Sequence, residues 1–408
     1  MSVRARPVGG KLLTTSVQIM LAVLGFATIA AVARFLKGLG ATTAMNDGFP
    51  WGIWIAFDVV VGTALASGGY AMALLVYVLN KGRYHPLVRP ALVTSFLGYS
   101  MAGIAIVFDL GRFWNLWRVP LFFWEWNGTS ILLEVALCMI VYTLVLAVEI
   151  SPAFLERWSA DGHGARAALA RAWLPRLERA LPFLVALGLV LPTMHQSSLG
   201  ALLLVAQTKV HPLWHTGLLP LLFLLTAFAM GYAVIFFEAI FSAHAFGRPL
   251  ETRLLARLGA FVAGIIVVFL AVRFSGLFAA DRLGLTVRAG GYAFFFWAET
   301  LLLAASAFLF LQQGVRASAA AQLQAALLAL AGGTLYRVDA FLTAYRPGQG
   351  WVYFPSFFEI LITLGIVATE TVAYVYLVRR YPVLAGVTGT ETETKPVPAA
   401  AVGQGVAS

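Results

Sequence analysis

Ten long apolar segments alternate with short polar segments along almost the whole chain. They lie at residues 16–37, 53–79, 88–110, 128–150, 181–206, 216–246, 253–278, 291–315, 319–340 and 356–379. About 20 apolar residues are enough for a helix to cross the roughly 30 Å of hydrocarbon in a bilayer. A helix also pairs its own backbone groups, as a lipid environment requires. The pattern therefore predicts an all-α, polytopic transmembrane protein of about ten helices. The ninth segment is the weakest, because Arg337 and Asp339 stand at its end.

The segments outside the apolar spans predict three different structures. Residues 1–15 lack a short apolar stretch followed by a small-residue cleavage site, so we expect a cytoplasmic N-terminus without a cleaved signal peptide. The connection 151–180 intersperses Arg with Leu, Ala and Trp, which predicts an amphipathic helix lying at the membrane interface. Residues 381–408 are poor in large apolar side chains and include the polar stretch TGTETETK, which predicts a disordered cytoplasmic tail.

Composition and charge agree with a membrane location. The chain is 61% hydrophobic and 11% charged, whereas about a quarter of the residues in an average soluble domain are charged. The net charge of +10 does not indicate a nucleic-acid-binding face, because the Lys and Arg residues are spread over short loops. Of these 28 residues, 18 fall on the side of the N-terminus and 10 elsewhere. By the positive-inside rule, both termini are predicted to be cytoplasmic in a bacterial inner membrane protein.

Cysteine and histidine limit which cofactors this chain could bind by itself. The single cysteine, Cys138, excludes an intrachain disulfide and any cysteine-ligated iron–sulfur or zinc site built by this chain alone. A bis-histidine haem needs two imidazoles at similar depth, and only His195 lies securely within a span. The other histidines fall in loops or near the end of a span: His85, His163, His211, His215 and His244. We therefore expect no haem, no iron–sulfur cluster and no metal site in the chain.

A few titratable side chains lie inside the spans, and most of them share one level. With about 1.5 Å of rise per residue, Asp58 lies roughly 8 Å and Glu134 roughly 9 Å from the outer end of its span. His195 is roughly 21 Å from the inner end of its own span, which is again the outer half. Asp109 closes the third span on the outer side, and Tyr99 is near mid-depth. Because a charge inside a bilayer costs about 2.5–3.5 kcal/mol, these groups require an explanation.

Two interpretations of these titratable side chains at one depth are open. Each acid could be a buried helix–helix contact, paired with Arg112, a serine or a backbone carbonyl. Alternatively, convergent acids, an imidazole and a tyrosine are typical of proton transfer to a bound redox ligand. The second half of the chain has a similar but less regular set of charged side chains inside its spans. Arg273, Glu299 and Glu359 lie in the outer half of the membrane, and Glu238 and Glu370 lie closer to the cytoplasmic side.

The stretch NDGFPWGIWIAFD at 46–58 is a polar turn followed by a tryptophan-rich helix start. It places Asn46, Asp47, Trp51 and Trp54 at the outer interface. The tryptophans could anchor the protein in an aromatic belt or form a lid over a ligand.

The stretch LPTMHQSSLG at 191–200 puts several hydrogen-bonding side chains into an otherwise apolar helix. His195, Gln196 and Ser197 follow Pro192, which frees backbone carbonyls and predicts a kink. Such polar side chains must face protein or water rather than lipid.

Several of these stretches are similar to one known family. They are GGKLL (9–13), NDGFPWGIWIAFD (46–58), GRYHPLVRPAL (82–92), GYSMAGIAIVFDLGRFWNL (98–116), LPTMHQSSLG (191–200) and KVHPLW (209–214). From about residue 8 to about 380 the chain resembles the NrfD/PsrC superfamily of quinone-interacting membrane subunits, specifically its HybB-like branch. The combination of WGIW, YHPLVRPA and LPTMHQSS carries this resemblance.

The resemblance implies a ten-helix, cofactor-free membrane subunit built around two four-helix bundles, with 16–380 as a transmembrane quinone-binding domain. Such subunits pass electrons between a peripheral iron–sulfur subunit and a quinone, either menaquinone or ubiquinone. For the HybB-like branch, the implied partners are a periplasmic, ferredoxin-like iron–sulfur subunit and a [NiFe] hydrogenase. The chain would be the quinone-reactive subunit of such a complex rather than an enzyme by itself.

We therefore expect the quinone headgroup near the outer face, among the second to fifth spans. One quinone carbonyl would be bound by His195, Gln196 or Ser197, and the other by Asp58 or by the Asn46/Asp47 loop, with Trp51 and Trp54 nearby. Protons would pass through Glu134 and Tyr99, while Asp109 and Arg112 set the charge around them.

Three other interpretations are open. The same role could serve a sulfur-compound oxidoreductase, as in DsrP-like or polysulfide-reductase-like subunits. Intramembrane acids also occur in secondary transporters and channels, although the two halves contain no strong matching pair of broken helices. A passive membrane anchor would tolerate neutral residues in place of the buried acids.

Overall fold

The computed structural model describes residues 5–160, 163–250 and 252–385. Within these residues ten helical segments are long and apolar enough to cross a membrane, and they correspond to the ten predicted spans. Their bounds are α1 (Thr15–Lys37), the irregular second span (Trp54–Val78), α5 (Val88–Asp109), α7 (Ile131–Ala160), α8 (Ala165–Val205), α9 (Leu219–Phe246), α10 (Thr252–Ala279), α12 (Gly291–Leu311), α14 (Ala319–Val338) and α15 (Phe357–Arg380). The prediction of a polytopic all-α membrane protein is confirmed.

The ninth span, the weakest in the sequence, is a complete helix. α14 continues through a π-helical turn, η7 (Asp339–Thr343). Arg337 and Asp339, which weaken its apolar pattern, are 0% and 1% exposed. The two charged side chains therefore face the protein interior, and the lipid-facing side of the helix remains apolar.

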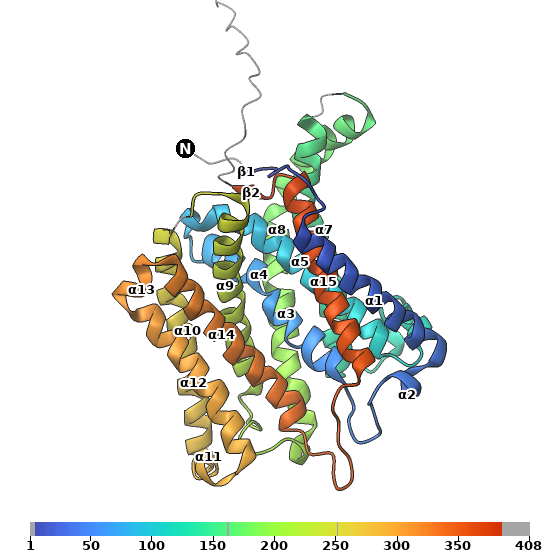
Figure 1. Ribbon diagram of the computed structural model, residues 1–408, viewed down its shortest axis with the longest axis vertical. Helices are drawn as coiled ribbons and strands as arrows, with labels where there is room; N and C mark the ends of the chain where they lie inside the picture. Colours follow the sequence, from blue (N-terminus) through green and yellow to red (C-terminus); the bar gives the residue numbers. More distant parts are fainter. Residues whose placement is uncertain (1–4, 161–162, 251, 386–408) are drawn as a thin grey trace, which may run out of the picture.

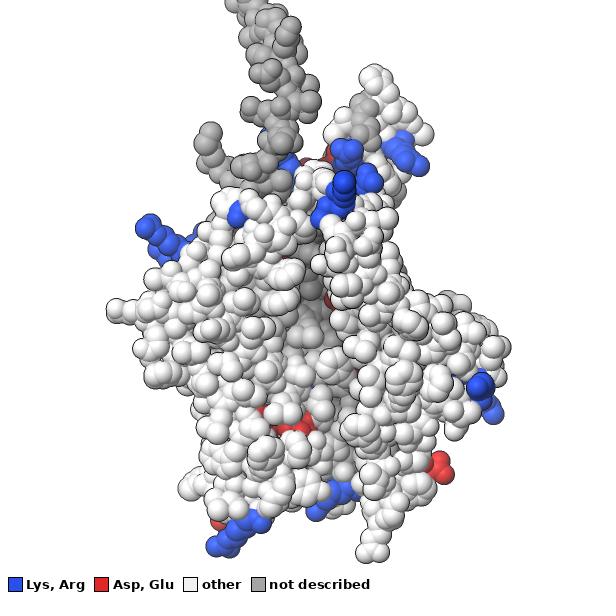
Figure 2. Space-filling model, viewed as in Figure 1, with Lys and Arg blue, Asp and Glu red and all other residues white. Residues whose placement is uncertain are grey.

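The helices form two bundles and a flanking pair. The second span, α5, α7 and α8 make the first bundle, and α9, α10, α12 and α14 make the second. α1 packs along α15, and α15 lies against α5 and the start of the second span (Figure 1). This is the arrangement of two four-helix bundles that the family resemblance implies. Lys and Arg gather toward the two ends of the helices, with a belt of mainly uncharged surface between them (Figure 2).

The two ends of the described chain meet on one side of the molecule. β1 (Ala5–Arg6) pairs with β2 (Leu384–Ala385) in a short antiparallel sheet. We call this the inner end of the molecule and the opposite side the outer end (Figure 1). The pairing corrects the predicted tail, because Leu384 and Ala385 belong to the sheet. Residues 386–408, the rest of that tail, lie outside the described residues.

Short helices complete the connections. At the outer end are α2 (Leu39–Thr42), η4 (Phe113–Asn115), α6 (Arg118–Leu121), η5 (Phe123–Glu125), η6 (Gln207–Lys209) and α11 (Leu285–Arg288). At the inner end are η3 (Gly82–Leu87) and α13 (Gln313–Ala317).

The connection 151–180 does not form the predicted interfacial helix. α7 continues to Ala160 and α8 begins at Ala165, so the two helices project together from the inner end as a hairpin (Figure 1). Ala167 and Ala170 are buried where α8 packs with α7. The prediction was wrong because an amphipathic face packs on a neighbouring helix as well as on a membrane.

The second span is the most buried of the ten and is not a regular helix. It consists of η1 (Trp54–Val59), α3 (Gly62–Leu65), α4 (Gly68–Ala73) and η2 (Leu74–Val78), of which η1 and η2 are π-helical. Its interruptions leave backbone carbonyls that need partners within the membrane. Side chains of other helices supply them: Arg337 Nη1 donates to Val60 (2.8 Å), Ser95 Oγ to Ala66 (2.5 Å) and the Tyr232 hydroxyl to Ala71 (2.6 Å). Short π-helical turns occur frequently at functional sites.

Candidate functional site

The outer halves of α7 and α8 bring two of the polar side chains together. Ser198 Oγ donates a hydrogen bond of 2.7 Å to Glu134 Oε1. Glu134 is partly exposed at the outside of the bundle, whereas Ser198 is buried. Glu134 is therefore the member of this pair that borders the surface of the bundle.

His195 lies one helical turn from Ser198 and is fully buried. Its Nδ1 is 3.2 Å from the carbonyl oxygen of Val135, the residue after Glu134. Because a carbonyl can only accept, Nδ1 carries a proton, and in the neutral ring Nε2 is an acceptor. Nε2 is buried without a partner among the described residues. A ligand that donates a hydrogen bond, such as a hydroxyl group, would satisfy it.

Gln196 extends this polar group into the centre of the first bundle. Its Nε2 donates to Thr63 Oγ1 at 3.0 Å and to the Tyr99 hydroxyl at 3.4 Å. The ring of Tyr99 is 5.5 Å from that of His195. Gln196 Oε1 has no partner among the described residues. We call Glu134, Ser198, His195, Gln196 and Tyr99 the α7–α8 cluster.

Ser197 does not join this cluster. It is partly exposed on the other side of α8, and its Oγ donates to the carbonyl of Met194 at 2.9 Å. Consecutive residues of a helix point about 100° apart, and the sequence does not give the absolute orientation of the helix. Ser198 rather than Ser197 is therefore the serine that contacts Glu134.

Asp58 faces a different neighbour. Its Oδ2 accepts a hydrogen bond of 2.7 Å from Thr363 Oγ1 of α15. It is 5% exposed and lies within electrostatic range of Glu370, also on α15. The predicted layer therefore divides between the α7–α8 cluster and the contact between the second span and α15.

The cation beside Asp109 is Arg34 and not Arg112. Arg34, on α1, is 2% exposed and lies within electrostatic range of Asp109. It donates to the carbonyls of Phe108 and Leu110 at 2.9 and 2.8 Å and so closes the outer end of α5. Arg112 is exposed in the following loop. Among the described residues no ion pair joins Arg112 to Asp109, because proximity in sequence does not by itself bring a side chain to the carboxyl.

The side chains of the outer loop before the second span make mainly structural contacts. Asn46 bonds to its own loop and donates to the carbonyl of Val352 at 3.0 Å, while Asp47 is exposed. Trp51 Nε1 donates to the carbonyl of Phe341 at 2.8 Å and so ties the loop to the ninth span. Trp54 is fully buried, and its Nε1 has no partner among the described residues. Of these four residues, Trp54 is the one with a free buried donor.

The second bundle contains its own buried polar group in the outer half. Arg273 is ion-paired with Glu299, which also accepts from Trp214 Nε1 at 3.0 Å. Arg273 lies over the rings of Phe296 and Tyr336, at 4.2 and 5.0 Å from their centres. The sequence indicated Arg273 and Glu299 as intramembrane charges, and the structure makes them partners.

Arg337 links the two bundles and was missed as a functional candidate. Besides Val60, it donates to the carbonyl of Phe223 at 2.6 Å. It also lies within electrostatic range of Tyr99 and His195, so its positive charge acts on the α7–α8 cluster. The only signal in the sequence was a charge at the end of a weak apolar segment.

His211 shows how tightly the outer loop between η6 and α9 is packed. Its ring stacks on that of Tyr292, with 4.1 Å between the centres. Burial and, to a smaller extent, the nearby Arg346 lower the pKa of His211 to about 4 from its ordinary 6.5. His211 is therefore neutral at pH 7 and serves the packing of the loop.

Comparison with known proteins gives consistent matches. Residues 41–345 match the family described as polysulphide reductase, NrfD. The chain is 40% identical, over 94% of its length and 96% of the relative, to the probable Ni/Fe-hydrogenase 2 b-type cytochrome subunit of Escherichia coli (strain K12). It is 33% identical to the menaquinone reductase integral membrane subunit of Nitratidesulfovibrio vulgaris, over 44% of this chain and 40% of that one. The Hdr-like menaquinol oxidoreductase integral membrane subunit of Archaeoglobus fulgidus is 22% identical over 63% of this chain and 60% of that one.

The name of the Escherichia coli relative corrects the prediction about haem. The expectation that the chain binds no haem is contradicted, because the Escherichia coli relative is named a b-type cytochrome subunit. Histidine is the usual ligand of such a haem. Among the described residues, His195 and His215 each have a buried ring nitrogen without a hydrogen-bond partner, and these two imidazoles are the candidates for such a ligand.

Proposed function

Because the chain belongs to the NrfD family and is a multi-pass membrane subunit of a respiratory oxidoreductase complex, we propose that it passes electrons between an external iron–sulfur subunit and the membrane quinone pool, with coupled protonation. The resemblance to HybB-like subunits is confirmed by the match over nearly the whole length of the hydrogenase relative. The name of the Nitratidesulfovibrio relative supports a quinone as the electron carrier in the bilayer.

The quinone headgroup binds at the α7–α8 cluster. One observation carries this assignment: the Glu134–Ser198 hydrogen bond reaches the outer surface of the bundle beside two buried acceptors that lack partners, His195 Nε2 and Gln196 Oε1. A buried acceptor without a partner costs about 1–3 kcal/mol. A hydroquinone hydroxyl would bind such an acceptor and remove that cost.

The reaction at this site is the addition of two electrons and two protons to a quinone, which gives the hydroquinone. In the neutral tautomer, His195 accepts a hydrogen bond from the new hydroxyl, and the protonated ring would donate to the quinone oxygen instead. Glu134 exchanges protons with the bound ring, and the Ser198 hydroxyl holds its carboxyl in place. Asp58 and the free indole N–H of Trp54 are the candidates for the far side of the ring.

The electron donor docks at the outer end. The cluster lies in the outer halves of its helices, so a periplasmic, ferredoxin-like subunit on that side would have the shorter path to the quinone. A [NiFe] hydrogenase is the partner that the Escherichia coli relative supports, and both termini would face the cytoplasm of an inner membrane protein. A sulfur-compound oxidoreductase is the second candidate, supported by the family description.

Glu134→Gln tests the site in membranes that contain the whole complex. We expect reduction of 2,3-dimethyl-1,4-naphthoquinone to fall by about tenfold or more, because the amide cannot exchange a proton. Glu125→Gln is the matched control, since Glu125 is exposed in an outer loop with Arg118 at 3.8 Å. Wild-type turnover in a fully inserted Glu134→Gln protein would contradict the site.

The electron donor that drives quinone reduction distinguishes the two candidate complexes. Hydrogen should drive quinone reduction in the wild-type membranes if the partner is a hydrogenase. Reduction driven by sulfide or sulfite, and not by hydrogen, would assign the chain to a sulfur-compound complex instead.

A further inference from the structure

α15 has a line of polar side chains along the face that packs against the protein. Glu359, Thr363, Glu370 and Tyr374 are spaced by 4, 7 and 4 residues, which places them on one side of a helix. From the first to the last, the helix rises about 22 Å, which is most of the hydrocarbon thickness. The opposite face of α15 has exposed apolar side chains such as Leu364 and Val367. The carboxyls of this line therefore lie on the side of α15 that packs against the protein.

Three members of this line, Thr363, Glu370 and Tyr374, lie near polar groups from other helices. Near the inner end, the Tyr374 hydroxyl is hydrogen-bonded to Glu238 of α9. Glu370 lies beside α5, where a Cβ on Gly98 would be 3.5 Å from its Oε1, and within electrostatic range of Asp58. Asp58 is in turn bonded to Thr363. Three carboxyls, Glu238, Glu370 and Asp58, thus follow one another from the inner to the outer half.

The surface beside this line is open rather than closely packed. Figure 2 shows a cleft between the α9–α14 side and α15, with acidic side chains visible inside it. Glu238, Glu370 and Tyr374 are each partly exposed. Ionisable groups facing lipid are costly, so such a cleft in a membrane protein is expected to contain water.

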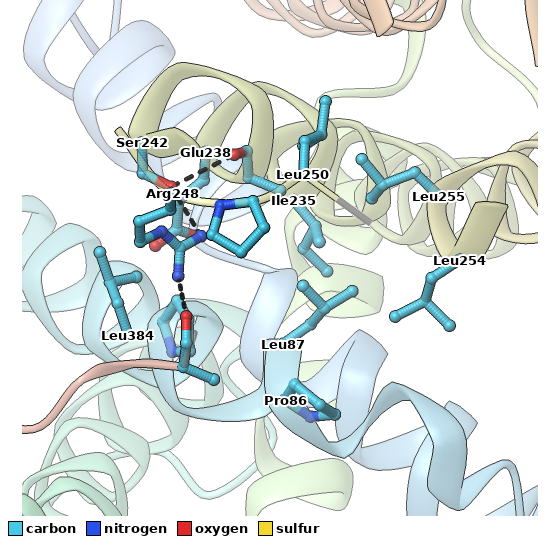
Figure 3. Close-up of a pocket in the computed structure, with 14 residues that line it drawn as sticks. Pro86, Leu87, Ile235, Glu238, Ser242, Arg248, Leu250, Leu254, Leu255 and Leu384 are labelled. Atoms are coloured by element: carbon cyan, nitrogen blue, oxygen red, sulfur yellow. Dashed lines mark hydrogen bonds between the residues drawn. The ribbon is translucent and has the colours of Figure 1, made fainter. Parts of the chain in front are cut away.

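The line begins at a cavity on the inner end. A cavity of about 150 Å³ is lined by Glu238, Ser242 and Arg248 together with apolar residues that include Leu87 and Leu250 (Figure 3). Arg248 donates to the carbonyl of Ala385, so the second strand of the terminal sheet forms part of its wall. The volume is large enough for several water molecules, and the Glu238 carboxyl would be a polar partner for them.

From this arrangement we propose that the buried face of α15 is a proton path, which takes protons from the inner end through the cavity at Glu238 and delivers them by way of Glu370 to Asp58. This inference rests on the proposed quinone chemistry and specifies the side from which its protons come. A hydronium ion in the cavity protonates the Glu238 carboxylate and leaves water. The Tyr374 hydroxyl accepts this proton and releases its own toward Glu370, one helical turn away, and Glu370 then protonates Asp58.

Proton uptake from the inner end has a physical consequence. If electrons arrive from the outer end and protons from the inner end, the two charges meet within the membrane, and each quinone reduced stores part of the redox energy as a membrane potential. Proton uptake from the outer end would store none.

The chain offers a rival inner route that serves as a control. A second cavity, of about 370 Å³, lies between α5, α7 and α8 and is lined by Glu149, Arg89 and Glu156. Glu149 is a carboxyl at the inner half of α7 that makes no contact with α15 among the described hydrogen bonds. Glu149→Gln therefore removes a similar group from the other side of the first bundle.

The test uses the purified complex in proteoliposomes, with the inner end of this subunit facing the lumen and a pH dye inside. Reduced methyl viologen outside supplies electrons, and 2,3-dimethyl-1,4-naphthoquinone accepts them. We expect the lumen of wild-type vesicles to become alkaline during turnover. Glu238→Gln and Glu370→Gln should slow this proton uptake by at least tenfold, and Glu149→Gln should leave it unchanged.

A milder pair of variants separates proton transfer from folding. Tyr374→Phe removes only the hydroxyl that contacts Glu238, whereas Tyr376→Phe alters an exposed ring on the same helix. Only the first should slow the uptake. Rapid uptake in Tyr374→Phe and Glu238→Gln, or loss of uptake in Glu149→Gln alone, would overturn the path. Quinone reduction without a change of lumenal pH would also overturn it while leaving the proposed function intact, whereas absence of any quinone reduction would refute the function itself.

Discussion

The guanidinium of Arg337 donates a hydrogen bond of 2.8 Å to the carbonyl oxygen of Val60, although 277 residues separate the two in the chain. Val60 follows the π-helical turn in the most buried span, and Arg337 belongs to the second bundle. The contact therefore joins the two bundles and pairs a backbone oxygen that has no water to bind. It also places a positive charge within range of Tyr99 and His195.

Replacing Arg337 with Leu should destabilise the protein strongly. The carbonyl of Val60 loses this donor, and a buried acceptor left unpaired costs about 1–3 kcal/mol. The carbonyl of Phe223 keeps the hydrogen bond from Thr226 Oγ1 at 3.0 Å. We expect a lower apparent melting temperature in detergent and less protein in the membrane. Arg112→Leu removes an exposed guanidinium and should melt like the wild type. Equal melting temperatures for the two variants would refute the role of Arg337 in joining the bundles.

The adjacent serines of α8 give a test of the α7–α8 cluster. Ser198→Ala removes the hydroxyl that holds Glu134, and a hydrogen bond to a charged group contributes about 1.5–3 kcal/mol. If that free energy is needed in the transition state, quinone reduction should fall by about tenfold or more. Ser197→Ala removes a hydroxyl that bonds only to Met194 and should change nothing. The same loss of turnover in both variants would mean that the contact with Glu134 is not the cause.

Gly231 should tolerate no side chain. A Cβ there would be 2.7 Å from the carbonyl carbon of Ser67, so α9 and the second span would have to separate. Overpacking of this kind costs about 1–3 kcal/mol, and Gly231→Ala should lower the melting temperature. Gly264→Ala, where a Cβ has no atom within 4 Å, should be neutral or slightly stabilising. A neutral Gly231→Ala would show that the two helices can move apart freely.

The packing of the outer loop should weaken in acid. Burial lowers the pKa of His211 to about 4 from 6.5, so between these values the unfolded chain binds a proton that the folded chain does not. Stability contributed by His211 is therefore complete above about pH 6.5 and is lost as the pH falls toward 4. The melting temperature should fall between pH 7.5 and 5, and His211→Gln should flatten that dependence. His85→Gln, at an exposed inner-end histidine, should leave it unchanged.

The sequence alone predicted the ten spans, and it did so because hydropathy and length are local properties. The same reasoning failed for 151–180, since an apolar face does not reveal whether it packs on lipid or on a neighbouring helix. The structure shows that α7 covers part of that face.

For the candidate site, the sequence determined which side chains are costly in a membrane and at which depth they lie. It could not determine their partners. Ser198 rather than Ser197 meets Glu134, and Arg34 rather than Arg112 lies beside Asp109, because helix rotation and packing between distant spans decide these contacts. The hydrogen bond between Glu238 and Tyr374 joins residues 136 positions apart. Which buried charges become a site therefore depends on the tertiary structure, since in lipid each polar group must find its partner on another helix.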